Sequence, residues 1–271
     1  MDRTAGGSGI GGRVKVVGHV ERVDARRLCY AEFVDRFMRP NRPVVLTGLT
    51  SSWRSCQDWT LAADRRAPDL EFLARTFPSP FVQVADCSSW EFSDQKRLEM
   101  SMREFVDHWV GSSSNGNSGG SLLYLKDWHF VKELGLLFML MFLGPTAGRQ
   151  MNLRSSVYNI NDDVSEKQFP EFNNAEWLEC TQEQNEIIFV PSGWYHQVHN
   201  LEDTISINHN WFNGYNLHWV WNLLHEDYKV AKDYIEDIRD ICDDFEGLCQ
   251  RNLAANTGMN FYDFFVFITR P

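Results

Sequence analysis

The imidazole of His196 has the best setting for metal chemistry in this sequence. It lies in the middle of residues 194–198, an aromatic and β-branched stretch that predicts a strand, directly after the turn residues 191–193. Neutral imidazole is the commonest metal ligand among protein side chains. His199 projects to the opposite face of the same strand, so the two histidines cannot bind one metal ion within it.

The register of the following strand decides what surrounds His196. Residues 204–211 alternate between a polar and an apolar face: the polar face carries Thr204, Ser206, Asn208 and Asn210, and the apolar face carries Ile205, Ile207, His209 and Trp211. A four-residue turn over 200–203 would place His196 among isoleucines, whereas a five-residue turn over 199–203 would place it among small polar side chains. We favour the second register, because small polar side chains make a poor core. The general alternative is that a lone histidine only packs in the core or faces solvent.

Two other histidines precede an acid at the spacing H-x-D/E. His19 and Glu21 stand near the N-terminus, and His225 and Asp227 lie in an acidic helix, where positions two apart do not share a face. His129 has no carboxylate at strand spacing. These three histidines are therefore weaker candidates for a ligand role than His196.

The elements that must position His196 are predicted from periodicity and turn residues. Helical spacing of apolar residues predicts helices over 25–38, 69–76 and 102–110, and short apolar runs predict strands over 44–46, 81–85, 122–125 and 186–190. Residues 111–121 contain only Gly, Ser and Asn and are expected to form a loop. We divide the chain into a flexible tail over 1–24, one domain over 25–212 and a helical region over 213–271.

An apolar stripe with spacings of four and three runs from Leu217 to Phe245. It predicts one long helix with Asn216 as its N-cap. Residues 226–246 carry nine acids against three bases, so the opposite face is acidic and solvated. Such a stripe either packs on the rest of the chain or forms the seam of a homodimer through the C-terminal helix. Both interpretations stay open from the sequence.

Composition excludes several classes of function. The 271 residues carry 26 Lys and Arg against 37 Asp and Glu, a formal net charge of −11, so we expect no nucleic-acid partner and no membrane-surface partner. The longest apolar run, residues 134–143, is too short to cross a bilayer. The six cysteines are dispersed and form no C-x-x-C pair. With no recognisable secretory leader, they predict reduced thiols in an intracellular protein.

Two consecutive segments carry a family resemblance. Residues 188–198 read IFVPSGWYHQV and residues 200–211 read NLEDTISINHNW, which resembles the hairpin that bears the second iron histidine in the Jumonji-C (JmjC) oxygenases. Residues 40–47 (PNRPVVLT) and 123–128 (LYLKDW) add to the likeness. The resemblance extends over about residues 25–130 and 185–265.

The resemblance implies a mainly β fold with flanking helices, a double-stranded β-helix of the cupin or jelly-roll type. It implies an oxygenase that uses iron(II) and 2-oxoglutarate, the iron being held by two histidines and one carboxylate. On this likeness His196 matches the second iron histidine, and Asn208 matches the position of a polar contact to 2-oxoglutarate. The likeness further implies a cytoplasmic protein lysyl hydroxylase whose protein substrate is the translation-termination release factor.

The sequence departs from the family pattern upstream of His196. The family pattern needs an H-x-D/E strand for the first histidine and the carboxylate, followed by a lysine strand that anchors 2-oxoglutarate. Here no histidine occurs between His129 and His196. Residues 142–148 resemble the family sequence just before that motif, and residues 157–164 resemble the loop well after it. The simplest interpretation is an internal deletion near residues 148–157, which leaves the double-stranded β-helix incomplete.

This departure separates two hypotheses about function. With two of three iron ligands missing, the chain is expected to have no oxygenase activity, although its family is enzymatic. The alternative is a non-catalytic JmjC-like module that binds a protein partner. A cupin-like isomerase or zinc hydrolase would need further His or Cys ligands on one face, which the sequence does not offer.

Overall fold

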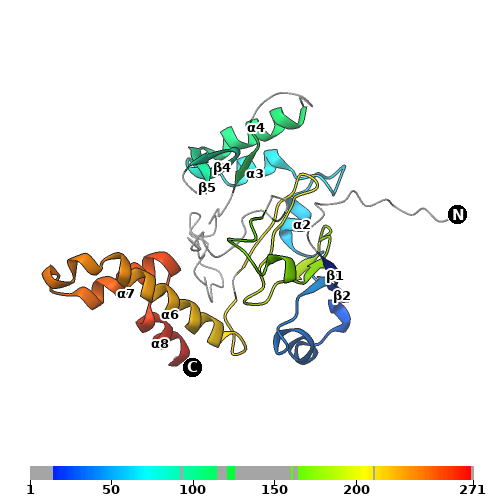
Figure 1. The fold of residues 1–271 in the computed structure, drawn as a ribbon. Helices are drawn as coiled ribbons and strands as arrows, with labels where there is room; N and C mark the ends of the chain where they lie inside the picture. Colours follow the sequence, from blue (N-terminus) through cyan, green and yellow to red (C-terminus); the bar gives the residue numbers. More distant parts are fainter. Residues whose placement is uncertain are drawn as a thin grey trace. The chain divides into compact units, whose positions relative to one another are not determined.

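The structure is a computed structural model that describes residues 15–91, 94–114, 121–125, 160, 164–209 and 211–269 (Figure 1). The chain folds as two compact units. Unit 1 comprises Met1–Thr50, Ala147–His199 and Asn213–Pro271, and unit 2 comprises Ser51–Thr146 and Asn200–Phe212. None of the described helices is long and apolar enough to cross a lipid bilayer.

A three-stranded sheet covered by a short helix forms the core of unit 1. Its strands are β2 (Glu21–Asp24), β3 (Val44–Thr47) and β8 (Ile187–Phe189), and β3 pairs parallel with β2 and antiparallel with β8. The helical cover consists of the 3-10 turn η1 (Ala25–Arg27), α1 (Tyr30–Phe33) and the π-helical turn η2 (Val34–Met38). The apolar side chains of α1 and η2 pack on the fully buried Val44. This burial explains why the predicted strand over 44–46 forms.

A two-stranded parallel sheet lies in the same unit. It pairs β1 (Val16–His19) with β7 (Trp177–Glu179), which follows the 3-10 turn η3 (Phe172–Asn174). The prediction of a flexible tail over residues 1–24 is therefore wrong for residues 16–24. Residues 16–24 include four β-branched valines, a residue type favoured in strands, and β1 pairs with β7 while β2 pairs with β3.

The described residues of unit 2 form an antiparallel sheet and three helices. The sheet has the order β5 (Asp94–Met100), β4 (Val82–Glu91), β6 (Leu123–Leu125), and the helices are α2 (Arg54–Asp58), α3 (Leu70–Thr76) and α4 (Met102–Ser114). Its core consists of Ala74, Val82, Val84, Met102, Phe105 and Val106. The Asp69 carboxylate caps α3 by accepting a hydrogen bond from the Phe72 amide at 2.9 Å. The prediction of a Gly/Ser/Asn loop over 111–121 is wrong for residues 111–114, which belong to α4, and residues 115–120 lie outside the described residues.

The C-terminal part of unit 1 is helical, and its helices lie together in Figure 1 (orange to red). They are α6 (Leu217–Tyr234), the 3-10 turn η4 (Glu236–Ile241), α7 (Phe245–Thr257) and α8 (Phe261–Thr269). The prediction of one long helix from Leu217 to Phe245 is wrong. The helix α6 ends at Tyr234, η4 follows, and α7 packs against α6. Asp244 caps α7 through the Gly247 amide, which explains where the new helix begins.

The hairpin predicted around His196 does not form. Residues 194–200 and 204–209 belong to no strand, although their alternation is that of one. An isolated two-stranded hairpin is at best marginally stable in water, so the alternation alone cannot hold a ladder. The internal deletion predicted near residues 148–157 lies outside the described residues.

Candidate functional site

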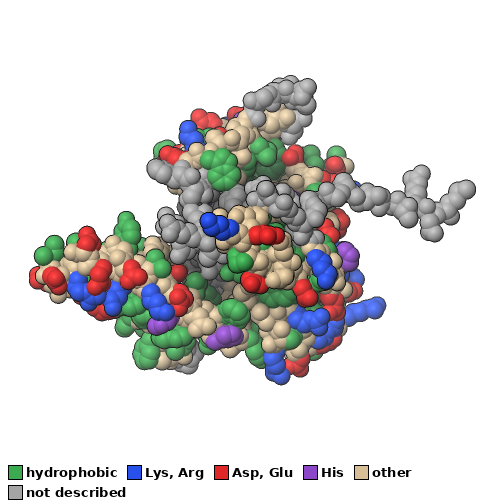
Figure 2. Space-filling model, viewed as in Figure 1, with side chains coloured by type: hydrophobic (Ala, Val, Ile, Leu, Met, Phe, Trp, Pro, Cys, Tyr) green, Lys and Arg blue, Asp and Glu red, His purple; other side chains and the backbone are tan. Residues whose placement is uncertain are grey.

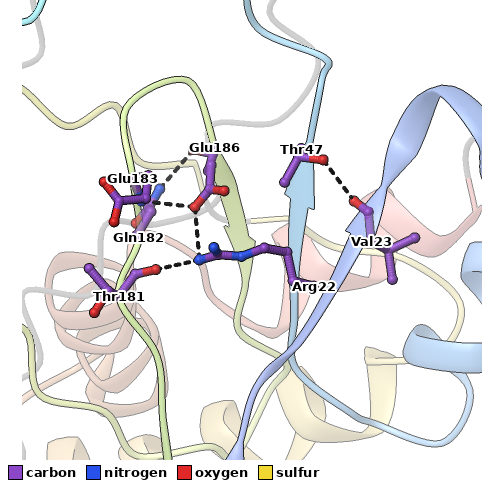
Figure 3. A network of polar contacts seen from close by, with 7 residues as sticks. All are labelled: Arg22, Val23, Thr47, Thr181, Gln182, Glu183 and Glu186. Atoms are coloured by element: carbon purple, nitrogen blue, oxygen red, sulfur yellow. Dashed lines mark hydrogen bonds and ion pairs between the residues drawn. The ribbon is translucent and has the colours of Figure 1, made fainter. Parts of the chain in front are cut away.

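A polar network fixes the turn that leads into β8. The Arg22 guanidinium of β2 donates to the Thr181 carbonyl at 2.6 Å and forms an ion pair with the Glu186 carboxylate at 3.1 Å (Figure 3). The same carboxylate accepts the Glu183 amide at 2.8 Å, and the Glu186 carbonyl accepts the Gln182 side chain. The Glu186 side chain is only 10% exposed. The network therefore ties the start of β8 to the central sheet of unit 1.

The chain turns sharply between β8 and His196. Pro191 is buried, and its carbonyl accepts the Trp194 amide at 3.3 Å. Gly193 has φ +82°, a left-handed conformation that favours glycine. The direction in which the chain leaves Gly193 sets where the His196 segment runs.

His196 is exposed in the structure. Its Nδ1 lies 3.3 Å from the Trp194 carbonyl oxygen. Nearby, the Gln197 side chain contacts the His199 ring at 2.6 Å and accepts the Ile160 amide at 3.0 Å. Within unit 1, His196 therefore lies on the surface beside extended backbone.

The polar pocket predicted around His196 is not formed by strand pairing. The register that would create it needs residues 204–209 in a ladder, and these residues are exposed and outside any strand. Asn208, the predicted 2-oxoglutarate contact, is exposed and belongs to unit 2, whereas His196 belongs to unit 1. The roles of His196 and Asn208 stay predictions.

In each of the other two histidine–acid pairs, at least one member contacts a different residue. Glu21 forms an ion pair with Arg36 rather than facing His19 as a second ligand. The His225 ring stacks on Trp221 with an interplanar angle of 17°. Among the described residues, no three His, Cys, Asp or Glu side chains gather as a metal site would require. The donors that the structure describes therefore do not fit the two-histidine, one-carboxylate iron site of the predicted family.

Asp86 of unit 2 is buried and lies at the centre of a polar cluster. Its carboxylate accepts the hydroxyls of Ser89 and Ser121 and the Ser88 amide, and these hydrogen bonds hold its pKa below the usual value for an aspartate. The cluster joins β4 to Ser121, two residues before β6. Sequence reasoning missed it because the partners are serines spread over 35 positions, and we assign it a structural role.

Three comparisons with known proteins bear on the chain. A family model described as "JmjC domain, hydroxylase" matches residues 126–211. The Arabidopsis thaliana "Arginine-specific demethylase JMJ20" is 42% identical over 332 residues, which cover 95% of this chain and 71% of that protein. The human "2-oxoglutarate and iron-dependent oxygenase JMJD4" is 30% identical over 303 residues, which cover 88% and 72%. The chain belongs to the JmjC-domain oxygenase family.

Other JmjC relatives match over a smaller share. The Caenorhabditis elegans "Bifunctional arginine demethylase and lysyl-hydroxylase psr-1" is 24% identical over 255 residues, which cover 74% of this chain and 63% of that protein. The JmjC domain implies a cupin or jelly-roll fold. The family is one of 2-oxoglutarate- and iron-dependent oxygenases, and the predicted resemblance is confirmed.

The alignment with the Arabidopsis relative is longer than this chain. The alignment with the Arabidopsis relative spans 332 positions, 61 more than the 271 residues of this chain. At least that many positions of the alignment therefore have no residue of this chain opposite them.

Proposed function

We propose that this chain is a JmjC protein derived from oxygenases that act on a basic residue of a protein, and that it lacks the segment needed for turnover. The observation that carries the proposal is the absence of any histidine between His129 and His196, where the family places its first iron ligand. Without that histidine and its carboxylate, His196 is one donor of three.

The length of the alignments supports a missing segment. Sixty-one or more positions are enough for several strands with their connections, since strands average five to six residues. A deletion near residues 148–157 would remove the two iron ligands and the 2-oxoglutarate lysine in one event. It would also remove strands that the segments on either side of residues 200–203 could pair with, which agrees with the finding that residues 194–199 and 204–209 belong to no strand.

The substrate class follows from the names of the relatives and from charge. The Arabidopsis protein is named a demethylase of arginine, and the nematode protein is named for both arginine and lysine chemistry. The net charge of −11 favours association with a basic protein surface. We propose that the complete relatives of this chain modify a basic side chain. The lysine of the translation-termination release factor, in the cytoplasm, is our specific candidate.

A restoration experiment tests the proposal. The segment that the Arabidopsis relative carries in the gap would be inserted into this chain, and succinate formation from 2-oxoglutarate would be measured with iron(II). We expect turnover in the restored protein, none in the chain as it stands, and loss of turnover with His196→Ala. Turnover that survives His196→Ala would remove His196 from the iron site.

A non-catalytic binding module is the second candidate, favoured by exposed apolar side chains on the C-terminal helices. Tyr262, Phe265 and Ile268 of α8 are exposed at a spacing of three, and Tyr234 and Ile241 lie open at the end of α6 and in η4. Figure 2 shows hydrophobic side chains among interspersed acids and bases over these helices. The partner in this proposal is a protein, or a second copy in a homodimer.

Two measurements separate the candidates. A transcript that encodes an H-x-D/E segment between codons 148 and 157 would support the damaged oxygenase, whereas an uninterrupted transcript would support the binding module. Sedimentation of the purified chain would give its mass. A dimer that Tyr234→Glu dissociates would place the homodimer seam on α6.

A further inference from the structure

Asn41 adopts an unusual backbone conformation next to the His196 segment. Its φ is +55°, in the left-handed region that non-glycine residues rarely occupy. Both of its polar groups bind the turn after β8: the side-chain amide donates to the Ser192 carbonyl at 3.0 Å, and the Asn41 carbonyl accepts the Trp194 indole N–H at 2.8 Å. The amides of Asn41 and Arg42 donate to the Met38 and Phe37 carbonyls, so Asn41 ends the helical segment and at the same time binds the turn after β8.

Trp219, near the start of α6, contacts the same turn. A Cβ added to Gly193 would lie 2.6 Å from Cη2 of Trp219, so the indole ring of Trp219 rests directly on the glycine backbone. Nearby, the Arg39 guanidinium lies 5.8 Å from the centroid of the Tyr215 ring. The turn before β3, the turn after β8 and the start of α6 therefore meet within unit 1.

We propose that Asn41 and Trp219 are positioning residues that clamp the turn at Gly193 and thereby fix where the His196 segment leaves the sheet. The two hydrogen bonds of Asn41 hold Ser192 and Trp194 on either side of Gly193, while Trp219 blocks movement on the third side. His196 follows Trp194 by two residues. The functional meaning of the clamp rests on the proposed role of His196, but the clamp itself is independent of iron.

Site-resolved proteolysis of the full chain by chymotrypsin tests the clamp. Cleavage after Trp194 and Tyr195 requires this segment to open, whereas cleavage after Tyr234, exposed at the end of α6, reports general loosening of the same unit. We expect Asn41→Ala and Trp219→Ala to raise the ratio of the first cleavage rate to the second by about tenfold. Mass spectrometry of the early fragments measures both rates.

Matched variants distinguish local from general effects. Asn41→Gly keeps the left-handed backbone and the carbonyl acceptor, so it should raise the ratio by no more than about threefold. Trp194→Phe keeps an aromatic ring but removes the indole donor to the Asn41 carbonyl, and it should raise cleavage after Tyr195, even if the larger substitutions fail to fold. Asn173→Ala, which removes the hydrogen bond that the Asn173 side chain donates to the exposed Glu166 carboxylate, should leave the ratio unchanged.

An unchanged ratio in Asn41→Ala and Trp194→Phe would overturn the clamp, and so would equal acceleration at all sites. Neither result depends on metal binding. A failed restoration experiment with a selective increase in proteolysis would instead overturn the role of His196 and leave the clamp in place.

Discussion

β8 (Ile187–Phe189) and residues 204–209 both have the side-chain pattern of a strand, but only β8 forms one. Ile187–Phe189 pairs with β3, is anchored by the Arg22–Glu186 ion pair, and packs Phe189 against Phe33 at 5.3 Å. Residues 204–209 alternate more regularly than β8, yet they are exposed and unpaired. The difference shows that strand pattern alone does not decide the outcome in this chain. A strand forms where a partner edge and a buried face are available.

The largest expected effect comes from shortening a buried valine of β3, the strand that pairs with β8. The matched variant shortens an exposed valine of residues 194–200. Val45→Ala in β3, where the side chain is fully buried, should lower the free energy of unfolding by about 2–4 kcal/mol, because it leaves a cavity beneath the β3–β8 pair. Val198→Ala, at 75% exposure, should change it by less than about 0.5 kcal/mol. Urea denaturation measures both values. Equal costs would mean that residues 194–200 are packed in solution.

The turn between the regions gives the next largest effect. Gly193→Ala should cost about 1–3 kcal/mol, because alanine is strained at φ +82° and its methyl group would collide with Trp219. Gly214→Ala is the control, since nothing lies within 4 Å of the added carbon. Thermal unfolding of both variants makes the comparison, and a harmless Gly193→Ala would contradict the close contact.

A smaller effect is expected from the network at the start of β8. Glu186→Gln keeps the shape of the side chain and removes the charge that pairs with Arg22, so it should cost about 1 kcal/mol. Glu32→Gln removes the exposed ion pair between Glu32 of α1 and Arg36 of η2. It should lower the free energy of unfolding by less than about 0.5 kcal/mol. Denaturation at low and high salt measures the difference. A larger cost for Glu32→Gln would show that burial of Glu186 adds nothing.

The smallest effect concerns pH and a hydrogen bond between the C-terminal helices α6 and α7. The Tyr228 hydroxyl donates to the Glu246 carboxylate, which raises the pKa of Tyr228 to about 12. The neutral phenol is favoured in the folded state, so its contribution is complete below pH 10 and is lost as the pH rises from 10 towards 12. Denaturation of the wild type and Tyr228→Phe at pH 9 and 11 should show a smaller loss in the variant. Identical losses would contradict the shift.

Sequence reasoning succeeded where the local signal and the packing agree. The strand at Val44 and the helix capped by Asp69 follow from apolar runs and a capping carboxylate. Sequence reasoning failed where contacts with residues far away in the sequence determine the structure. β1 pairs with β7, a strand that the sequence analysis did not predict, and β2 pairs with β3 although residues 21–24 were expected to belong to a flexible tail. The apolar stripe over 217–245 does not form one helix, because α7 packs against α6. An asparagine after a helical segment can signal a left-handed helix end, but the contacts of Asn41 with Ser192 and Trp194 gave no sequence signal. The family was readable from residues 188–211, because that motif is local.

Calorimetric titration of 2-oxoglutarate into the purified chain, with iron(II) under nitrogen, asks whether a cosubstrate site exists at all. With His196 as a single donor, we expect no saturable, iron-dependent heat, and the same trace for His196→Ala. A micromolar dissociation constant that His196→Ala abolishes would contradict the proposal, because it would mean that this polypeptide supplies the remaining ligands from residues we have not assigned.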